Sequence, residues 1–323
     1  MTTRPDEFDW IASLRTLTRD DPRALGLADD AAVLPGRPGF DMVISTDSMV
    51  EGVHFLAGER PEIIAQRLLR TSLSDLAAKA ARPFGYLLTT AWPPNRPRQY
   101  RAAFARGLAA DGDEFGVSLL GGDTVTTSGP MTFGATVLGW VPSGGAILRS
   151  GAREGDIVVV CGVIGDGWLG LRAARGEIAD PGGRLAAHYR LPKPLLTLRD
   201  VLSRHARAAA DVSDGLLADA GHVAQASGCG VQIELETLPL SIGAAAWCAS
   251  QPHEGRARLE LASGGDDYAL VCALDPADEA AFRASVAALG VPAAAVGVFR
   301  SAPGIGVSLG GKSLGAERFG WRH

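Results

Sequence analysis

Two patterns of apolar residues alternate along the chain. Short runs rich in Val and Ile are separated by longer Ala, Leu and Arg segments in which apolar residues recur at helical spacing. The short runs predict strands at 41–46, 84–91, 117–121, 131–140, 156–162, 230–236, 268–274 and 294–299. The longer segments predict helices at 61–80, 97–111, 166–176, 194–208, 213–227 and 276–289. This alternation indicates a mixed α/β or α+β protein.

Two segments interrupt the pattern. The stretch from Pro142 to Asp156 combines turn residues with mixed charge near the middle of the chain. We interpret it as the boundary between an N-terminal domain, 1–148, and a C-terminal domain, 149–323. Residues 177–194 contain three prolines and two adjacent glycines, which predict a loop.

The composition narrows the class of protein. With 323 residues, 46% of them hydrophobic and 21% charged, the chain can bury a substantial core. Its formal charge of −5 gives no general attraction to nucleic acid or anionic membranes. Its apolar stretches fall far short of the roughly 20 residues that cross a bilayer, and the polar N-terminus is unlike a secretory signal. We expect a cytoplasmic protein with neither nucleic acid nor membrane as partner.

The four cysteines are widely spaced, and no two of them form a C-x-x-C pair. Each stands beside small or apolar neighbours. We therefore expect four buried, reduced thiols and no zinc site.

Two glycine-rich motifs resemble nucleotide-binding sequences. Residues 165–170, GDGWLG, fit the dinucleotide pattern, but the loop 177–194 stands where a second parallel strand should follow, so we predict only a tight strand-to-helix turn. Residues 306–313 fit the P-loop pattern, yet only ten residues follow Ser313 and no helix has room there. We expect a β-hairpin that turns at Gly310 and Gly311.

Aspartates gather where predicted strands end or helices begin. The positions, with the hydroxyl residues beside them, are Asp30, Ser45, Thr46, Asp47, Ser74, Asp75, Asp123, Asp211, Ser213, Asp214, Asp266 and Asp267. Any one of them could simply cap a helix. The group as a whole has few basic residues close in sequence, and two carboxylates about 4 Å apart repel by about 4 kcal/mol at an effective dielectric of 20. Converging carboxylates therefore indicate cations, and hard oxygen ligands suit Mg²⁺ that holds substrate phosphates.

This chemistry favours phosphoryl transfer, which needs charge neutralisation and in-line placement more than covalent work by the protein. Glycines before Asp123 and Asp266 allow close backbone approach, which suits a nucleotide or phosphate. No Cys-His or Ser-His spacing suggests a nucleophile.

Eight segments in order resemble the thiamine-monophosphate kinase family, from Asp29 to the C-terminus. They are DDAAVL, STDSMVEGVHF, SLSDLAAKAARP, GGDTVTTSGP, LRSGAREGD, DVSDGLLADAGHVAQASG, SGGDDYAL and FGWRH. The same superfamily contains aminoimidazole ribonucleotide synthetase, selenophosphate synthetase and a hydrogenase maturation factor. STDSMVEGVHF and the terminal FGWRH resemble the kinase branch.

The resemblance implies an α+β protein with a two-domain, aminoimidazole ribonucleotide synthetase-like fold. Its N-terminal domain would form a β-barrel-like core with a second subunit in a homodimer, and an α+β C-terminal domain would follow. The implied activity is ATP- and Mg²⁺-dependent phosphorylation of thiamine monophosphate to thiamine diphosphate, by direct transfer of the γ-phosphate without a phosphoenzyme.

The resemblance also implies roles for individual residues. Several Mg²⁺ ions would be held by Asp30, Ser45, Thr46, Asp47, Asp75, Asp123, Asp211 and Asp214, of which Asp47, Asp75, Asp123 and Asp214 would be catalytic. ATP would contact Phe104, Gly122, Asp123, Arg149 and Ser213. Thiamine monophosphate would contact His54, Asp266 and Trp321.

Three of these residues also have a simpler structural explanation. Without the resemblance, His54 would be a satisfied core histidine, Arg149 a solvated linker charge and Trp321 C-terminal packing. The family usually has Glu in place of Asp266, Asn in place of Ser72 and Thr in place of Ser45. Two other functions stay open: another ATP-dependent enzyme of the superfamily, and a catalytically silent nucleotide-binding regulator that has lost metal aspartates.

Overall fold

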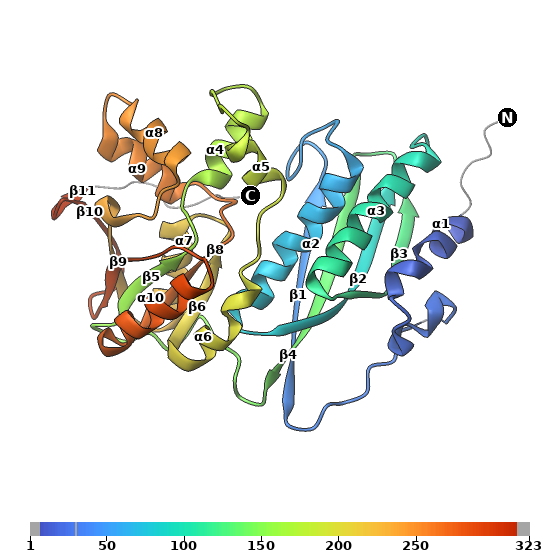
Figure 1. Cartoon of the computed structure of the whole chain (residues 1–323), viewed down its shortest axis with the longest axis horizontal. Helices are drawn as coiled ribbons and strands as arrows, with labels where there is room; N and C mark the ends of the chain where they lie inside the picture. Colours follow the sequence, from blue (N-terminus) through green and yellow to red (C-terminus); the bar gives the residue numbers. More distant parts are fainter. Residues whose placement is uncertain (1–6, 30, 315–323) are drawn as a thin grey trace. The chain divides into compact units, whose positions relative to one another are not determined.

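The chain forms two compact units, which are described separately here from a computed structural model (Figure 1). The structure describes residues 7–29 and 31–314. The first unit holds the chain up to Leu76 together with Ala81–Gly144. The second holds the short segment Ala77–Ala80 and the chain from Gly145 onward.

The first unit is built on a four-stranded sheet in the order β1-β4-β2-β3. Its strands are β1 (Phe40–Val50), β2 (Arg82–Trp92), β3 (Ser118–Thr126) and β4 (Thr132–Pro142). Helices α2 (Pro61–Ala78) and α3 (Arg98–Phe115) lie along one face of this sheet (Figure 1). The short elements α1 (Glu7–Leu14), η1 (Arg15–Thr18) and η2 (Pro22–Leu27) precede it. β2 pairs parallel with β3 and antiparallel with β4.

An aromatic cluster fills the space between α3 and the sheet. The ring of Phe104 lies 5.3 Å from that of Trp92 and 4.5 Å from that of Phe133, measured between centroids. All three side chains are fully buried. Such contacts add about 0.5–1.5 kcal/mol per pair beyond simple burial, so they fix α3 against the sheet.

The second unit contains a seven-stranded mixed sheet in the order β11-β10-β7-β9-β5-β8-β6. Its strands are β5 (Ile157–Cys161), β6 (Ala206–Val212), β7 (Gly230–Glu234), β8 (Ala269–Leu274), β9 (Ala293–Arg300), β10 (Gly304–Leu309) and β11 (Lys312–Leu314). Its helices are α4 (Asp166–Ala174), α5 (Arg184–Arg190), α6 (Arg199–His205), α7 (Leu216–Ala226), α8 (Ile242–Ala249), α9 (Glu254–Ser263) and α10 (Glu279–Ala288), with short 3₁₀ turns η3 (Leu196–Leu198), η4 (Leu235–Thr237) and η5 (Pro276–Asp278). β8, which lies between β5 and the edge strand β6, is buried along its whole length.

The predicted strands are all present within a few residues of their expected ends, and so are most helices. The prediction of a helix over 194–208 is wrong in part, because α6 ends at His205 and β6 begins at Ala206. The loop predicted over 177–194 contains α5, and α8 and α9 were not predicted. β6 reads ARAAADV, and alanine favours a helix unless burial within a sheet overrides it.

The P-loop-like segment is the predicted hairpin. β10 and β11 pair antiparallel, and Gly310 and Gly311 both have positive φ, 56° and 75°. The amides of these two glycines point to one carboxylate, donating to Glu234 Oε1 at 2.9 Å and Oε2 at 3.0 Å. The carboxylate of Glu234 thus occupies the backbone nest in which a phosphate would have to bind.

The dinucleotide-like segment is likewise a turn between β5 and α4. Gly165 and Gly167 donate their amides to the two oxygens of Asp267, each at 2.8 Å. Asp267 is buried, and desolvation raises the pKa of its carboxyl well above the usual value despite these two bonds. An internal carboxylate again takes the position of a phosphate.

All four cysteines are free thiols, and three of them are buried while Cys229 is half-buried. No helix in the described part of the chain is both long enough and apolar enough to cross a membrane.

Candidate active site

One group of predicted site residues lies where β1 passes α2 in the first unit. Ser45 and Asp47 alternate with outward-facing neighbours on β1, and Asp75 lies in the last turns of α2. The Ser45 hydroxyl donates to Asp75 Oδ2 at 2.5 Å. The structure therefore brings three of the expected metal ligands to one place.

The electrostatics of this group are unfavourable without a cation. Burial and, to a smaller extent, the negative charge of Asp75 raise the pKa of Asp47 to about 6, and a hydrogen bond from Ser72 only partly offsets them. Ser72 is fully buried on α2, one turn before Asp75. A divalent cation would remove the repulsion between the two carboxylates.

A second group lies on the face of the same sheet that α2 and α3 do not cover, which we call the open face (Figure 1). The hydroxyls of Thr90 and Thr124 meet at 3.1 Å on the helix-covered face, where Thr90 is buried. Asp123 precedes Thr124, so its side chain points to the other face, and it is exposed there. On that face the hydroxyl of Thr46 lies 3.0 Å from that of Thr136.

The strand order separates Asp47 from Asp123. β1 and β3 are the two edge strands, so three strand spacings, about 14 Å, lie between their backbones. Ligands of one Mg²⁺ lie about 2.1 Å from it, so these two carboxylates do not share an ion within one chain. Asp123 instead lines a cavity of about 610 Å³, together with Asp29, Thr89 and Thr136.

The two glycines that precede the site aspartates have a structural explanation. A Cβ on Gly122 would lie 1.9 Å from the carbonyl oxygen of Leu88, and one on Gly265 would lie 2.4 Å from that of Ser213. Neighbouring backbone thus requires both glycines. The close approach that the sequence suggested for a ligand is made by the protein itself.

The ring of Phe104, an expected ATP contact, is fully buried beside those of Trp92 and Phe133. The apolar spacing along α3 explains this position better than a ligand contact does.

His54 lies in the turn that follows β1. Its Nδ1 accepts a hydrogen bond from the amide of Val50 at 3.1 Å, and its ring is half-buried. Because Nδ1 is an acceptor here, a neutral ring carries its proton on Nε2.

The second unit gathers its site residues at the end of β6. Asp211 is buried near the end of that strand, and Ser213 and Asp214 follow in the turn before α7. The amides of Ser213 and Asp214 both donate to Oδ2 of Asp219, each at 3.1 Å. Asp219 was not predicted as a site residue, although it lies in the quoted segment DVSDGLLAD.

Two further segments of the second unit carry predicted contacts. Arg149 is exposed, and its carbonyl accepts from the Ser227 hydroxyl at 3.2 Å. Asp266 has a positive φ of 70°, and its Oδ1 accepts from the Tyr268 hydroxyl at 3.1 Å. A positive φ is costly for a residue other than glycine and is concentrated at functional positions.

Asp30 and Trp321, predicted as a metal ligand and a substrate contact, lie outside the described residues. Across 7–29 and 31–314, no three His, Cys, Asp or Glu side chains form one metal-binding group. The residues present instead offer one or two carboxylates at a time, which is how proteins usually hold Mg²⁺ whose other ligands are water and phosphate.

The chain matches the family models of AIR synthase related protein, the N-terminal domain over residues 28–141 and the C-terminal domain over residues 153–310. It is 57% identical over 320 residues to the thiamine-monophosphate kinase of Caulobacter vibrioides, with 99% of this chain and 91% of the relative covered.

Two solved structures are similar to this chain over nearly its whole length. The thiamine-monophosphate kinase of Stenotrophomonas maltophilia K279a is similar with a TM-score of 0.82 and 32% identity, covering 95% of this chain and 96% of the other. AaThiL complexed with AMPPCP and TMP is similar with a TM-score of 0.78 and 25% identity, covering 99% and 97%.

Proposed function

The chain belongs to the thiamine-monophosphate kinases of the AIR synthase related family, and we propose how its own residues carry out the reaction. It is an enzyme that transfers phosphate from ATP to thiamine monophosphate and forms thiamine diphosphate. The family and the two-domain fold expected from the sequence are confirmed. The roles of individual residues below are our assignment.

The pair Asp47 and Asp75 carries the proposal. Burial, together with the charge of Asp75, raises the pKa of Asp47 to about 6, so the doubly ionised pair is destabilised in the metal-free protein. Ser45 contributes a third oxygen through its bond to Asp75. This set of hard oxygens fits Mg²⁺, which would supply charge neutralisation for the polyphosphate when bound.

The protein's own contribution is to place and separate the reacting groups. We assign Asp47, Asp75 and Ser45 to the metal site on the helix-covered face of the first unit's sheet, and Thr46 and Asp123 to metal on its open face. Asp123 and Gly122 also form the ATP side of this unit, beside the cavity on the open face. Asp30 keeps its expected metal role from the sequence alone. Phe104 is left out because it is buried.

In the second unit, we assign Asp211 and Asp214 to metal, and Ser213 and Arg149 to ATP. The Ser213 and Asp214 amides are already held by Asp219, so this turn is preorganised before ligands arrive. Arg149 is exposed, with five donors that suit phosphate oxygens.

The acceptor contacts are His54, Asp266 and Trp321. The ring of His54 is held in the turn after β1 by its bond from the Val50 amide, and the carboxylate of Asp266 is oriented by the Tyr268 hydroxyl. This bond fixes the orientation of the Asp266 side chain. Its carboxylate can accept from the amino group of the pyrimidine ring.

We further propose that the chain divides into domains 1–148 and 149–323 and that the enzyme is a cytoplasmic homodimer. The open face of the first unit's sheet supports the dimer, because Ile44 is 58% exposed and Val125 49% exposed there. Apolar side chains of this size are typical of a face that another subunit covers.

The function is tested by incubating the pure protein with ATP, Mg²⁺ and either thiamine monophosphate or free thiamine. We expect thiamine diphosphate from the first acceptor and at least about a thousandfold lower kcat/KM with the second, because the acidic set is arranged for two polyanions. Removal of Mg²⁺ by chelation should abolish the product. Comparable phosphorylation of free thiamine would contradict this account of the carboxylates.

Trp321 should separate acceptor recognition from metal chemistry. We expect Trp321→Ala to raise the KM for thiamine monophosphate roughly tenfold or more, because stacking and cation–π attraction to the acceptor rings contribute about 1–3 kcal/mol. The KM for ATP should hardly change. Steady-state titration of each substrate measures this, with circular dichroism as the folding control. Equal effects on both substrates would point to general packing instead.

A further inference from the structure

Asp219 is a buried residue whose carboxylate contacts the turn that precedes its own helix, α7 (Leu216–Ala226). It lies in the first turns of α7, whose N-cap is Gly215 without any side-chain cap. Only 1% of the residue is exposed, yet its Oδ2 accepts the amides of Ser213 and Asp214, which precede the helix. Oδ1 faces the ring of His222, with Nδ1 3.6 Å away. Asp219 therefore fixes the backbone of the turn between β6 and α7.

The same turn is held from its other side by the segment that carries Asp266. The amide of Asp266 donates to the carbonyl of Ser213 at 2.9 Å, and that of Tyr268 donates to the carbonyl of Val212 at 2.8 Å. Gly265 packs against the Ser213 carbonyl so closely that a Cβ would lie 2.4 Å from it. The turn therefore has its amides bound by Asp219 and its carbonyls bound by the Asp266 segment.

Within the second unit, these hydrogen bonds connect the residues assigned to ATP with the residue assigned to the acceptor. Ser213 and Asp214 are assigned to ATP and its metal, whereas Asp266 is assigned to the acceptor. Both Asp266 and Tyr268 have positive φ, 70° and 51°, a strained backbone that persists only where its surroundings hold it. A displacement of the turn would therefore move the donor contacts and the acceptor contact together.

We propose that Asp219 is a positioning residue that sets the register between phosphate donor and acceptor, by anchoring the Ser213–Asp214 turn on which the Asp266 segment rests. The proposal rests on the assigned kinase activity. Asp219 touches neither substrate. Its effect reaches both of them through two backbone amides on one side of the turn and two backbone carbonyls on the other.

A purely structural role would give a different result, and a matched variant separates the two. Asp156 is also 1% exposed and also accepts a backbone amide, that of Arg153, at 2.8 Å. It pairs with Arg207 at the far end of β6, about 20 Å from Ser213 along the strand. Asp156→Ala should therefore reproduce the loss of a buried carboxylate without moving the turn.

The experiment compares Asp219→Ala, Asp219→Asn and Asp156→Ala with the wild type. We expect Asp219→Ala to lower kcat by about a hundredfold at saturating substrates, the loss that a misplacement of about 1 Å produces. It should also raise the Mg²⁺ concentration needed for half-maximal rate and weaken AMPPCP binding measured by calorimetry. Asp219→Asn should lose less than about tenfold, because its side-chain oxygen still accepts both amides.

Asp156→Ala should shift the midpoint of urea unfolding about as much as Asp219→Ala does. It should leave kcat and AMPPCP binding near the wild-type values. If Asp219→Ala does not fold, Asp219→Ser, which is too short to reach the amides, takes its place. Equal kinetic changes in the Asp219 and Asp156 variants would overturn the proposal. Absence of kinase activity in the wild type would instead refute the proposed function, and the AMPPCP comparison would still test the role of Asp219.

Discussion

Replacing Asp47 by Asn should lower kcat/KM by roughly a thousandfold, about 4 kcal/mol of transition-state stabilisation, while the metal-free protein stays at least as stable as the wild type. The two effects have one cause. Burial and the neighbouring charge of Asp75 raise the pKa of Asp47 to about 6, so its negative charge opposes folding. An amide removes that charge, and with it a ligand for the cation. Steady-state kinetics and urea unfolding measure the two effects on the same sample.

Asp41→Asn is the matched control, since Asp41 is exposed at the start of the same strand and binds the amide of Gly144 at 2.7 Å. It should change neither rate nor stability appreciably. Asp123→Asn should lose activity to a degree similar to Asp47→Asn, with no stability change, because that carboxylate is exposed. Near-normal turnover in both Asp47 and Asp123 variants, with folding intact, would refute the metal assignment.

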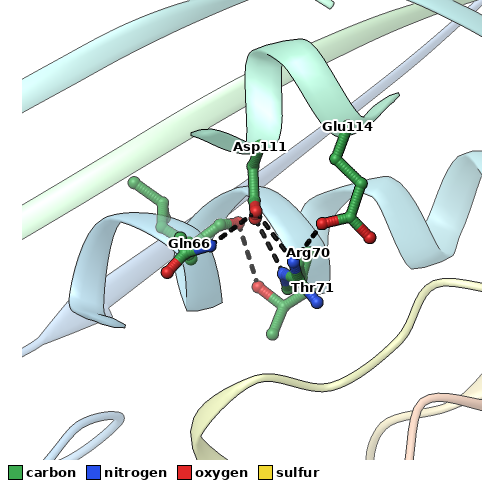
Figure 2. A network of polar contacts seen from close by, with 6 residues as sticks. Gln66, Arg70, Thr71, Asp111 and Glu114 are labelled. Atoms are coloured by element: carbon green, nitrogen blue, oxygen red, sulfur yellow. Dashed lines mark hydrogen bonds and ion pairs between the residues drawn. The ribbon is translucent and has the colours of Figure 1, made fainter. Parts of the chain in front are cut away.

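Replacing Asp111 by Ala should lower the free energy of unfolding by about 3–5 kcal/mol. Asp111 of α3 is completely buried and accepts two bonds from Arg70 of α2, Nε and Nη2 each at 2.8 Å, and one from Gln66 at 2.8 Å (Figure 2). Burial raises the pKa of Asp111 even though Arg70 opposes the rise. Without the carboxylate, the guanidinium of Arg70 loses both of its bonds to Asp111 and keeps its bond to Glu114 at the rim of this network.

Two further variants test whether this loss of stability arises from the buried ion pair of Arg70 and Asp111. Glu62 and Arg106 join the same two helices at 2.8 Å, but the side chain of Arg106 is 66% exposed, so Glu62→Ala should cost less than about 1 kcal/mol. The double variant Arg70→Met, Asp111→Leu should recover much of the stability that Asp111→Ala loses. Urea unfolding monitored by circular dichroism gives all three values. A loss as small for Asp111→Ala as for Glu62→Ala would contradict the interpretation.

The amphipathic elements of the fold could be predicted from the sequence, and the exceptions have physical causes. β1, β2 and β4 combine apolar alternation with β-branched residues, so both pattern and propensity indicate strands. β6 consists largely of alanine, and only its position beside β8 makes it a strand. α9 has an even mixture of charged and apolar residues and shows no clear periodic signal.

The chemistry of the candidate site could be predicted from the sequence better than the arrangement of its residues. Aspartates at strand ends indicated metal and phosphate, and Ser45, Asp47 and Asp75 do lie together. The sequence could not indicate that Asp123 would face the other side of the sheet, because this depends on the strand order and a bulge between Tyr86 and Leu87. Asp219 was also missed, since a buried aspartate in a helix has no signature of its own.

The segment Ala77–Ala80 affects how this protein can be made and divided. Its first two residues are the last two of α2, and the segment belongs to the core of the second unit. There Ala77, Ala78 and Ala80 are buried, and Lys79 Nζ donates to the carbonyl of Ala209 at 3.0 Å. During synthesis, these residues leave the ribosome well before β6, more than a hundred positions later, exists to receive them. Translation past Ala209 is therefore required before the end of α2 reaches its final environment. A truncated chain that stops at Gly144 would retain these alanines without their partners, so the first unit cannot be separated cleanly by a single cut.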